Sequence, residues 1–138
     1  DYAFGLGYTR TESYDGTTCD NAGSSAAADG SSCNDEMNVR VPRHQINLIG
    51  TKIFNNSLSS TLKVKYVGER RDYGSSLNNF QDVILSNYVV ADLVTNYNLF
   101  DLYNLNISAK NILGARYSEV YQYKALGRSI NFMIKKSY

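Results

Sequence analysis

Residue types that carry catalysis are scarce in this sequence. The 138 residues include one histidine, His44, which follows Pro42 and Arg43. A histidine acts as a general base only beside a nucleophile and an orienting acid, and no such set can be placed around His44. The sequence therefore predicts no catalytic residue and no enzyme activity, and His44 is better explained as a residue that opens a strand.

Metal ligands are equally poorly arranged. Cys19 and Cys33 have no second pair of cysteines or histidines at zinc-binding spacing. Three acids nearby, Asp29, Asp35 and Glu36, lack the spacing of a calcium loop. We therefore expect no metal site and no other cofactor.

The two cysteines favour a different chemistry. Both lie in one stretch rich in Ser, Gly, Ala and Asp. A cysteine pair that encloses a polar loop is typical of a disulfide in an oxidising compartment. A Cys19–Cys33 disulfide would stabilise the loop by roughly 3 kcal/mol in the chain-entropy model. Two unrelated thiols are the alternative.

Alternation of apolar and polar residues defines the elements that must position these groups. Residues two apart in a strand share a face, and this pattern recurs six times. The runs lie at residues 2–8, 46–54, 62–69, 89–99, 103–110 and 129–138. The last three predict strands of about ten residues, which is the length of membrane-spanning strands rather than of ordinary globular ones. No stretch approaches the roughly 20 apolar residues of a spanning helix.

The connections between the runs alternate in length. Long polar loops are expected near 13–38, 73–85 and 114–126, and tight turns at 55–57 and 100–101. In an up-and-down sheet this order places every long loop at one end and every turn at the other, as in outer-membrane barrels. Alternation alone does not distinguish a protein core from lipid, so a soluble secreted β-sandwich with a binding loop is an alternative.

Charge excludes one class of partner and assigns a face to several residues. The net charge of +1 provides no bulk field for nucleic acid. Within the runs, charged and amide side chains alternate with apolar ones, so they would face a water-filled lumen if the apolar face met lipid. The predicted lumen-facing residues are Lys63, Lys65, Asp92, Lys110 and Asn131.

Four short segments carry a more specific signal. Residues 40–44 read Arg-Val-Pro-Arg-His, and residues 66–72 read Tyr-Val-Gly-Glu-Arg-Arg-Asp. Residues 111–117 read Asn-Ile-Leu-Gly-Ala-Arg-Tyr, and residues 123–128 read Tyr-Lys-Ala-Leu-Gly-Arg. These resemble, in order, the motifs Arg-x-Pro-x-His, Tyr-x-Gly-x-Arg-x-Asp, Asn-Leu-Phe-Asp-x-x-Tyr and Tyr-x-x-x-Gly-Arg of the TonB-dependent outer-membrane receptors. The matching residues are Arg40, Pro42, His44, Gly68, Arg70, Asp72, Asn111, Tyr117, Gly127 and Arg128. The departure lies at residues 112–114, which read Ile-Leu-Gly where the family motif has Leu-Phe-Asp.

The resemblance implies an all-β fold, a portion of an antiparallel up-and-down transmembrane β-barrel. The chain would supply about six of about 22 strands. Residues 1–138 would then be a C-terminal fragment of the barrel, without the N-terminal plug domain. The implied location is the outer membrane of a Gram-negative bacterium, where the chain contacts lipid, the plug domain and the rest of the barrel.

The resemblance also implies a function. Such receptors actively import a scarce nutrient of the ferric siderophore, haem or cobalamin class, and the TonB energising complex acts through the N-terminal part. A terminal aromatic residue with apolar neighbours on its face is read by the barrel-assembly machinery, which gives that role to Phe132, Ile134 and Tyr138. The residues that bind substrate are not indicated. A structural or adhesive outer-membrane barrel without energised transport is the alternative function.

Overall fold

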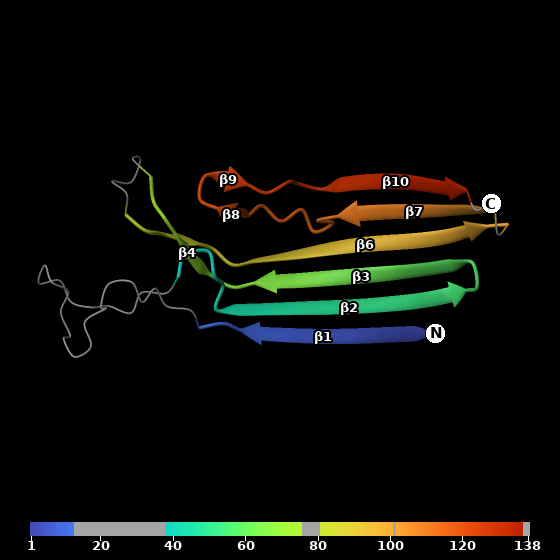
Figure 1. Cartoon of the computed structure of the whole chain (residues 1–138), viewed down its shortest axis with the longest axis horizontal. Helices are drawn as coiled ribbons and strands as arrows, with labels where there is room; N and C mark the ends of the chain where they lie inside the picture. The colour runs from blue at the N-terminus through green and yellow to red at the C-terminus, as the bar shows by residue number, and fades with distance from the viewer. Residues whose placement is uncertain (13–37, 76–80, 101, 137–138) are drawn as a thin grey trace, which may run out of the picture.

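One antiparallel sheet forms the body of the chain (Figure 1). The computed structural model describes residues 1–12, 38–75, 81–100 and 102–136. Cys19, Cys33 and Tyr138 lie outside the described residues, so their predicted roles stay predictions. The sheet has the strand order β1-β2-β3-β6-β7-β10, which is an up-and-down meander. Its strands are β1 (Tyr2–Arg10), β2 (His44–Asn55), β3 (Leu58–Val67), β6 (Tyr88–Leu99), β7 (Tyr103–Lys110) and β10 (Ser129–Lys136). The six alternating runs are thus six strands of one all-β sheet, as predicted.

The strands differ in length. β2 and β6 each contain 12 residues, which exceeds the roughly 9–11 residues that a tilted membrane-spanning strand needs. β7 and β10 each contain 8 described residues, fewer than the roughly ten that the sequence predicts for them.

The register of the strands gives the sheet two different faces. Residues directly opposite one another across the strands share a face, so the printed pairs assign each side chain. The apolar face carries Phe4, Leu6, Leu48, Leu62, Val64, Leu93, Leu105, Ile107, Ile130, Phe132 and Ile134. The polar face carries Gln45, Asn47, Lys63, Lys65, Asp92, Asn96, Asn106, Ser108, Lys110 and Asn131.

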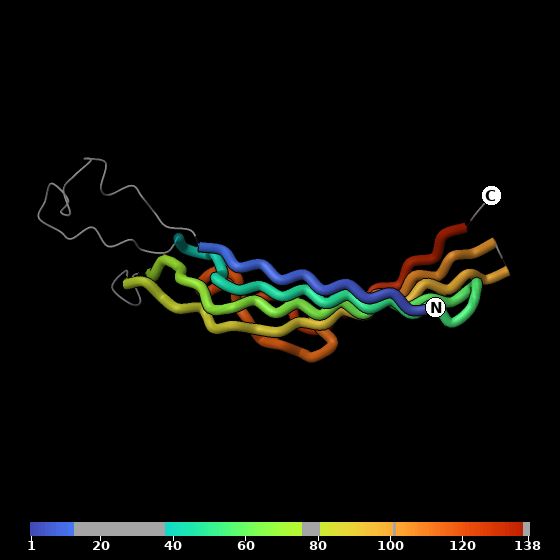
Figure 2. Tube along the Cα trace, turned by 90° about the horizontal axis from the view of Figure 1, so that it is seen from below, coloured from blue at the N-terminus to red at the C-terminus, as the bar shows by residue number. Residues whose placement is uncertain are grey.

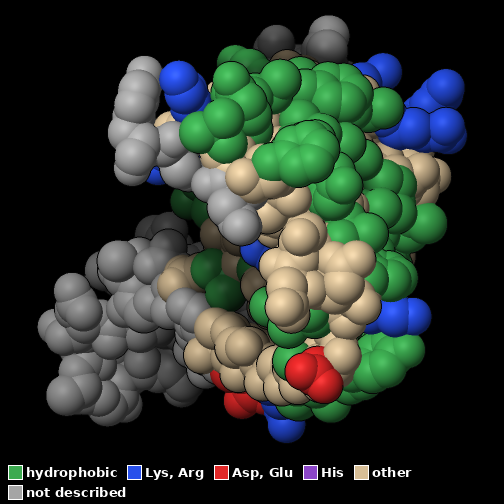
Figure 3. Space-filling model, turned by 90° about the vertical axis from the view of Figure 1, so that its right-hand side faces the viewer, with side chains coloured by type: hydrophobic (Ala, Val, Ile, Leu, Met, Phe, Trp, Pro, Cys, Tyr) green, Lys and Arg blue, Asp and Glu red, His purple; other side chains and the backbone are tan. Residues whose placement is uncertain are grey.

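No second layer covers the apolar face within the described residues. Phe4 is 84% exposed, Leu6 is 73% exposed and Phe132 is 70% exposed. Figure 3 looks onto the turn end of the sheet and shows hydrophobic side chains gathered along its upper and right-hand flank. An apolar surface of this extent needs a partner.

The connections leave the sheet at opposite ends according to their length. The β1–β2, β3–β6 and β7–β10 connections lie at one end, which we call the loop end (Figure 1). The β2–β3 and β6–β7 connections lie at the other, the turn end. At the β2–β3 turn, the Asn55 Oδ1 atom accepts hydrogen bonds from Ser57 N at 2.9 Å and from Leu58 N at 2.8 Å. An asparagine side chain that accepts hydrogen bonds from backbone N–H groups two and three residues ahead stabilises a tight turn, because it satisfies donors that have no partner strand there.

Two of the predicted loops contain short strands. β4 (Arg70–Asp72) pairs with β5 (Val83–Leu85), and β8 (Ser118–Val120) pairs with β9 (Tyr123–Lys124). Such pieces have two or three residues, which is too short for an alternating pattern to be visible in the sequence. Among the described residues there is no helix with the length and hydropathy to span a membrane.

We predict that the chain expressed alone in water aggregates. Its apolar face has no cover, and both edge strands, β1 and β10, present unpaired backbone groups. Analytical ultracentrifugation and thermal circular dichroism check this prediction. A soluble monomer with a cooperative unfolding transition would contradict the membrane interpretation, whereas recovery of sheet structure only with detergent would support it.

Candidate functional site

The three long connections converge on one group of polar and aromatic side chains at the loop end. We call Arg40, Arg70, Asp72, Tyr88 and Tyr117 the loop-end cluster. Each long connection contributes to it or lines it, because residue 40 precedes β2, residues 70 and 72 follow β3, and residue 117 lies between β7 and β10. Four of the five belong to the four motifs, and Tyr88 begins β6.

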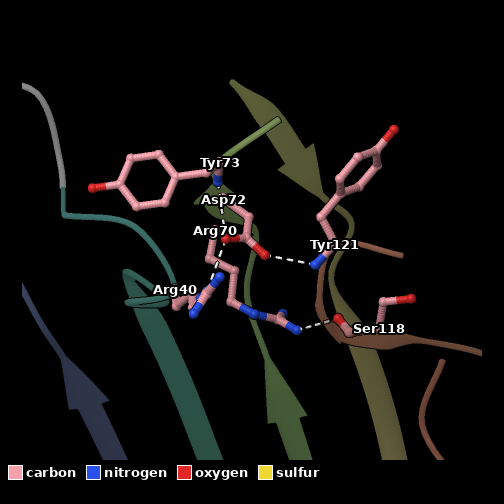
Figure 4. A network of polar contacts seen from close by, with 6 residues as sticks. All are labelled: Arg40, Arg70, Asp72, Tyr73, Ser118 and Tyr121. Atoms are coloured by element: carbon pink, nitrogen blue, oxygen red, sulfur yellow. Dashed lines mark hydrogen bonds and ion pairs between the residues drawn. The ribbon is translucent and has the colours of Figure 1, made fainter. Parts of the chain in front are cut away.

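Asp72 is the centre of this cluster (Figure 4). Its side chain is fully buried, with a relative exposure of 0%. The Oδ1 atom accepts hydrogen bonds from Arg40 Nε at 2.8 Å and from Tyr73 N at 2.9 Å. The Oδ2 atom accepts one from Tyr121 N at 2.6 Å. One carboxylate therefore joins the segment before β2, the strand β4 and the turn between β8 and β9.

Electrostatics favour the ionised form of Asp72. Burial acts to raise the pKa of Asp72, but the hydrogen bonds from Tyr121 N, Arg40 and Tyr73 N outweigh it and hold the pKa below its usual value. A carboxylate that accepts several N–H groups is stabilised in its charged form. The ion pair with Arg40 supplies the counter-charge that a buried carboxylate requires.

Arg70 fastens the third connection to the sheet. It is 5% exposed, and its Nη2 atom donates a hydrogen bond to Ser118 O (Figure 4). Its guanidinium lies 5.2 Å from the centre of the Tyr88 ring, which is a cation–π distance. Tyr88 in turn stacks on Tyr117 with ring centres 3.9 Å apart, and its hydroxyl donates to Glu119 Oε1 at 3.1 Å. Burial, followed by the charge of Glu119, raises the pKa of Tyr117.

Asn111 shapes the start of the third connection. Its backbone has a positive φ of 50°, a conformation that asparagine tolerates better than most residues. Its N–H donates to Asp92 Oδ1 at 2.8 Å, and its side chain both donates to Ala115 O and accepts from Ala115 N, each at 2.9 Å. The buried amide thus directs the chain off β7 and back across the sheet.

The β7–β10 connection lies over the polar face. Tyr88 and Asp92 belong to that face by register, and they contact Tyr117 and Asn111 respectively. Figure 2, which views the sheet near edge-on, shows residues of this connection on one side of the sheet. The connection is therefore placed opposite the apolar surface.

His44 and Gly68 form a second, smaller junction. The His44 Nδ1 atom and Tyr8 Oη are 2.9 Å apart, and Gly68 N donates to His44 O at 2.8 Å. A Cβ atom at Gly68 would lie 3.0 Å from His44 O, which explains the glycine by close backbone approach. His44 begins β2, as its sequence context predicts, and Pro42 is half-buried just before it.

The remaining predicted residues lie away from the cluster. Lys63, Lys65, Lys110 and Asn131 share the polar face with Asp92, while Phe132 and Ile134 lie on the apolar face of β10. Gly127 and Arg128 precede β10, and the Arg128 side chain lies against Gly114. These positions do not test whether the polar-face residues line a lumen or whether Phe132 and Ile134 are read by the assembly machinery, so both roles stay predictions.

The cluster is suited to holding loops in place rather than to catalysis. Among the described residues, no group of three or more His, Cys, Asp or Glu side chains is arranged to hold a metal ion. The sequence indicates the charged members of the cluster through their motifs. It does not indicate that Arg70 contacts Tyr88, 18 positions away, or the backbone groups of Ser118 and Tyr121, which lie 48 and 49 positions from their partners Arg70 and Asp72.

Comparisons with known proteins bear on the fold. No protein-family model matches the sequence, and no curated protein matches it either. Solved structures do match. The ferric-catecholate import receptor Fiu from Escherichia coli K12 is 19% identical, with a TM-score of 0.70, over 96% of this chain and 18% of Fiu. The siderophore receptor PirA from Acinetobacter baumannii is 16% identical, with a TM-score of 0.72, over 100% of this chain and 20% of PirA.

A third match comes from a ligand-bound receptor. The pyoverdine outer-membrane receptor FpvA from Pseudomonas aeruginosa PAO1, bound to pyoverdine, is 14% identical, with a TM-score of 0.70. The match covers 99% of this chain and 19% of FpvA. The chain thus spans about a fifth of each of these receptors. It has the fold of a β-barrel segment of outer-membrane siderophore receptors, which is the fold that the sequence resemblance implied.

Proposed function

We propose that the chain is the C-terminal barrel segment of a TonB-dependent receptor that imports a ferric siderophore across a Gram-negative outer membrane. The observation that carries the proposal is the sheet itself. Its longest strands have spanning length, one face is apolar and uncovered, and the other is polar. The fold of the three matched receptors supports the same conclusion.

The two faces then have separate tasks. The apolar face contacts lipid, and the polar face lines the lumen, where Lys63, Lys65, Asp92, Lys110 and Asn131 meet water and the plug domain. The remaining strands continue from the free edges of β1 and β10 and close the barrel. In this role the chain contributes wall and loops to a receptor and carries out no chemical reaction.

The ligand class follows from the relatives. All three matched receptors bear siderophore or ferric-catecholate names. They favour a ferric siderophore over haem or cobalamin, the other classes that the resemblance implied. The loop-end cluster supports the proposal because ligand-binding loops require a rigid base, and the cluster fixes the bases of three connections.

Iron uptake tests this function. The gene that encodes the chain is deleted, and cells grown under iron limitation are supplied with radioactive iron bound to siderophores. Uptake should fall on deletion, return on complementation, and stop when the protonmotive force is collapsed. Surface binding that persists without energy-dependent uptake would instead indicate a structural or adhesive barrel.

A further inference from the structure

A basic hollow lies within the β7–β10 connection. It has a volume of about 590 Å³ and is lined by residues 114–118, 124–125 and 127–128. Its charged lining residues are Arg116, Lys124 and Arg128, and no carboxylate lines it. All three cations are exposed. Three like charges around one hollow repel one another, and a bound anion relieves that repulsion.

The three cationic side chains also have no protein partner among the described residues. Within the described part of the chain, none of them forms an ion pair or a side-chain hydrogen bond. The neighbouring carboxylate, Glu119, accepts a hydrogen bond from the Tyr88 hydroxyl and, over residues 102–136, does not pair with any of these three cations. Their donors are therefore available to a ligand.

Gly114 lies against Arg128 and has no side chain that could pair with its guanidinium. A Cβ atom built on Gly114 would lie 2.5 Å from the Arg128 Nε and Nη2 atoms. The receptor motif that this segment resembles has Asp at that position, and an aspartate there would contact the guanidinium. In this chain the glycine leaves the guanidinium without a counter-ion.

The hollow is held in position by contacts already described. Asn111 forms hydrogen bonds with Ala115 and with Leu126 O, which lie in the two segments of the connection on either side of the hollow. Tyr117 stacks on Tyr88 of the polar face. The three cationic side chains therefore lie on a segment that is held in place over the polar face. This position favours a dissolved anion as the ligand over a lipid headgroup. Preorganised donors bind anions with less entropic cost.

We propose that Arg116, Lys124 and Arg128 form a binding site for the anionic oxygens of an iron complex, and that Gly114 keeps a carboxylate away from Arg128 in that site. The inference rests on the proposed function and specifies its substrate: a negatively charged ferric complex, with catecholate or carboxylate oxygens, rather than a neutral hydroxamate. Charge-assisted hydrogen bonds from guanidinium and ammonium groups would hold those oxygens.

The experiment compares two iron complexes of similar size and different charge. The intact receptor is reconstituted in lipid nanodiscs, and binding of a ferric tris-catecholate, which is anionic, is measured against that of a ferric tris-hydroxamate, which is neutral. The variants are Arg128→Gln, Lys124→Gln and Gly114→Asp. Lys135→Gln, which removes a lysine near the turn end of the same face, is the matched control. Heat-modifiable migration verifies that each barrel is assembled.

The wild type should bind the catecholate complex more tightly than the hydroxamate complex. Arg128→Gln and Lys124→Gln should each weaken catecholate binding by up to about fivefold, the size expected for loss of one exposed charge contact, and Gly114→Asp should also weaken it because it adds a carboxylate beside Arg128. Hydroxamate binding and the Lys135→Gln control should not change, and Arg128→Lys should retain most of the affinity because it keeps the charge. Gly114→Asp requires the flexible end of Arg128 to move and places a side chain at φ +68°, a conformation that aspartate adopts at some cost in stability, so the heat-modifiable migration of this variant is checked first.

Two outcomes separate this inference from the proposed function. Catecholate binding that is equal in the wild type and in all three variants overturns the inference alone, and so does a preference for the neutral complex. Failure of the intact receptor to bind either complex overturns the proposed siderophore function, and the inference with it.

Discussion

Phe132→Arg should destabilise the assembled barrel by about 2–4 kcal/mol, whereas Asn131→Arg should be tolerated. The two residues are adjacent in β10 but point to opposite faces. Phe132 lies opposite Ile107 on the apolar face and is 70% exposed, so an arginine there would enter hydrocarbon. Asn131 lies opposite Ser108 on the polar face, where an arginine meets water or the plug domain.

The measurement uses the full-length receptor in outer membranes. Abundance in the membrane, heat-modifiable migration and the urea midpoint of the refolded barrel report assembly and stability. Both variants introduce the same residue at neighbouring positions, so the added charge and the size of the new side chain are the same in both. Equal tolerance of the two changes would show that the faces of β10, or its location in a membrane, are assigned wrongly.

The sheet could be predicted from the sequence because its signal is local and repeated. A two-residue side-chain period places Leu105 and Ile107 on one face and Asn106 and Ser108 on the other, whatever the strand pairs with. The alternation of long and short connections then fixes the meander. Pairing between consecutive strands needs no long-range information, and the order of the six strands follows directly.

The loop end could be predicted only in part. The motifs indicate Arg40, Arg70 and Asp72 as important residues, but they do not indicate that the Asp72 carboxylate is buried and bonded to Tyr121 N. That contact joins residues 49 positions apart through a backbone group, which has no residue-type signature. The short strands β5, β8 and β9 lie within predicted loops, and β4 lies at the predicted end of the third strand; tertiary contacts rather than local patterns order them.

Gly114 shows how a departure from a motif gains meaning from the structure. In the sequence, glycine in place of aspartate only weakens the resemblance. In the structure, its backbone has a positive φ of 68° and its missing side chain would lie against Arg128. The local conformation suits glycine, while the lost carboxylate changes the charge of the hollow.

Asp72→Ala should release the loop end from the sheet while leaving the barrel assembled. The change removes the acceptor for Arg40 Nε, Tyr73 N and Tyr121 N, and each buried donor left without a partner costs about 1–3 kcal/mol. The protection of the Tyr73 and Tyr121 amides against hydrogen exchange should therefore fall by about 100-fold. Asp82→Asn is the control, because Asp82 is partly exposed and pairs only with Arg71 at 3.1 Å in the described contacts.

Acid should reproduce the effect of the substitution in the wild type. The pKa of Asp72 is lowered in the folded chain, so its stabilising contribution is complete above the unfolded-state pKa of about 4 and is lost as the pH falls through the folded value. Protection factors, which correct for the intrinsic pH dependence of exchange, should decrease for Tyr73 and Tyr121 below about pH 4. In Asp72→Asn this acid-dependent decrease should be absent, since no proton is taken up at position 72. Unchanged protection of both amides in Asp72→Ala would show that neighbouring contacts, such as that of Arg70 with Ser118, hold the loop end without the carboxylate.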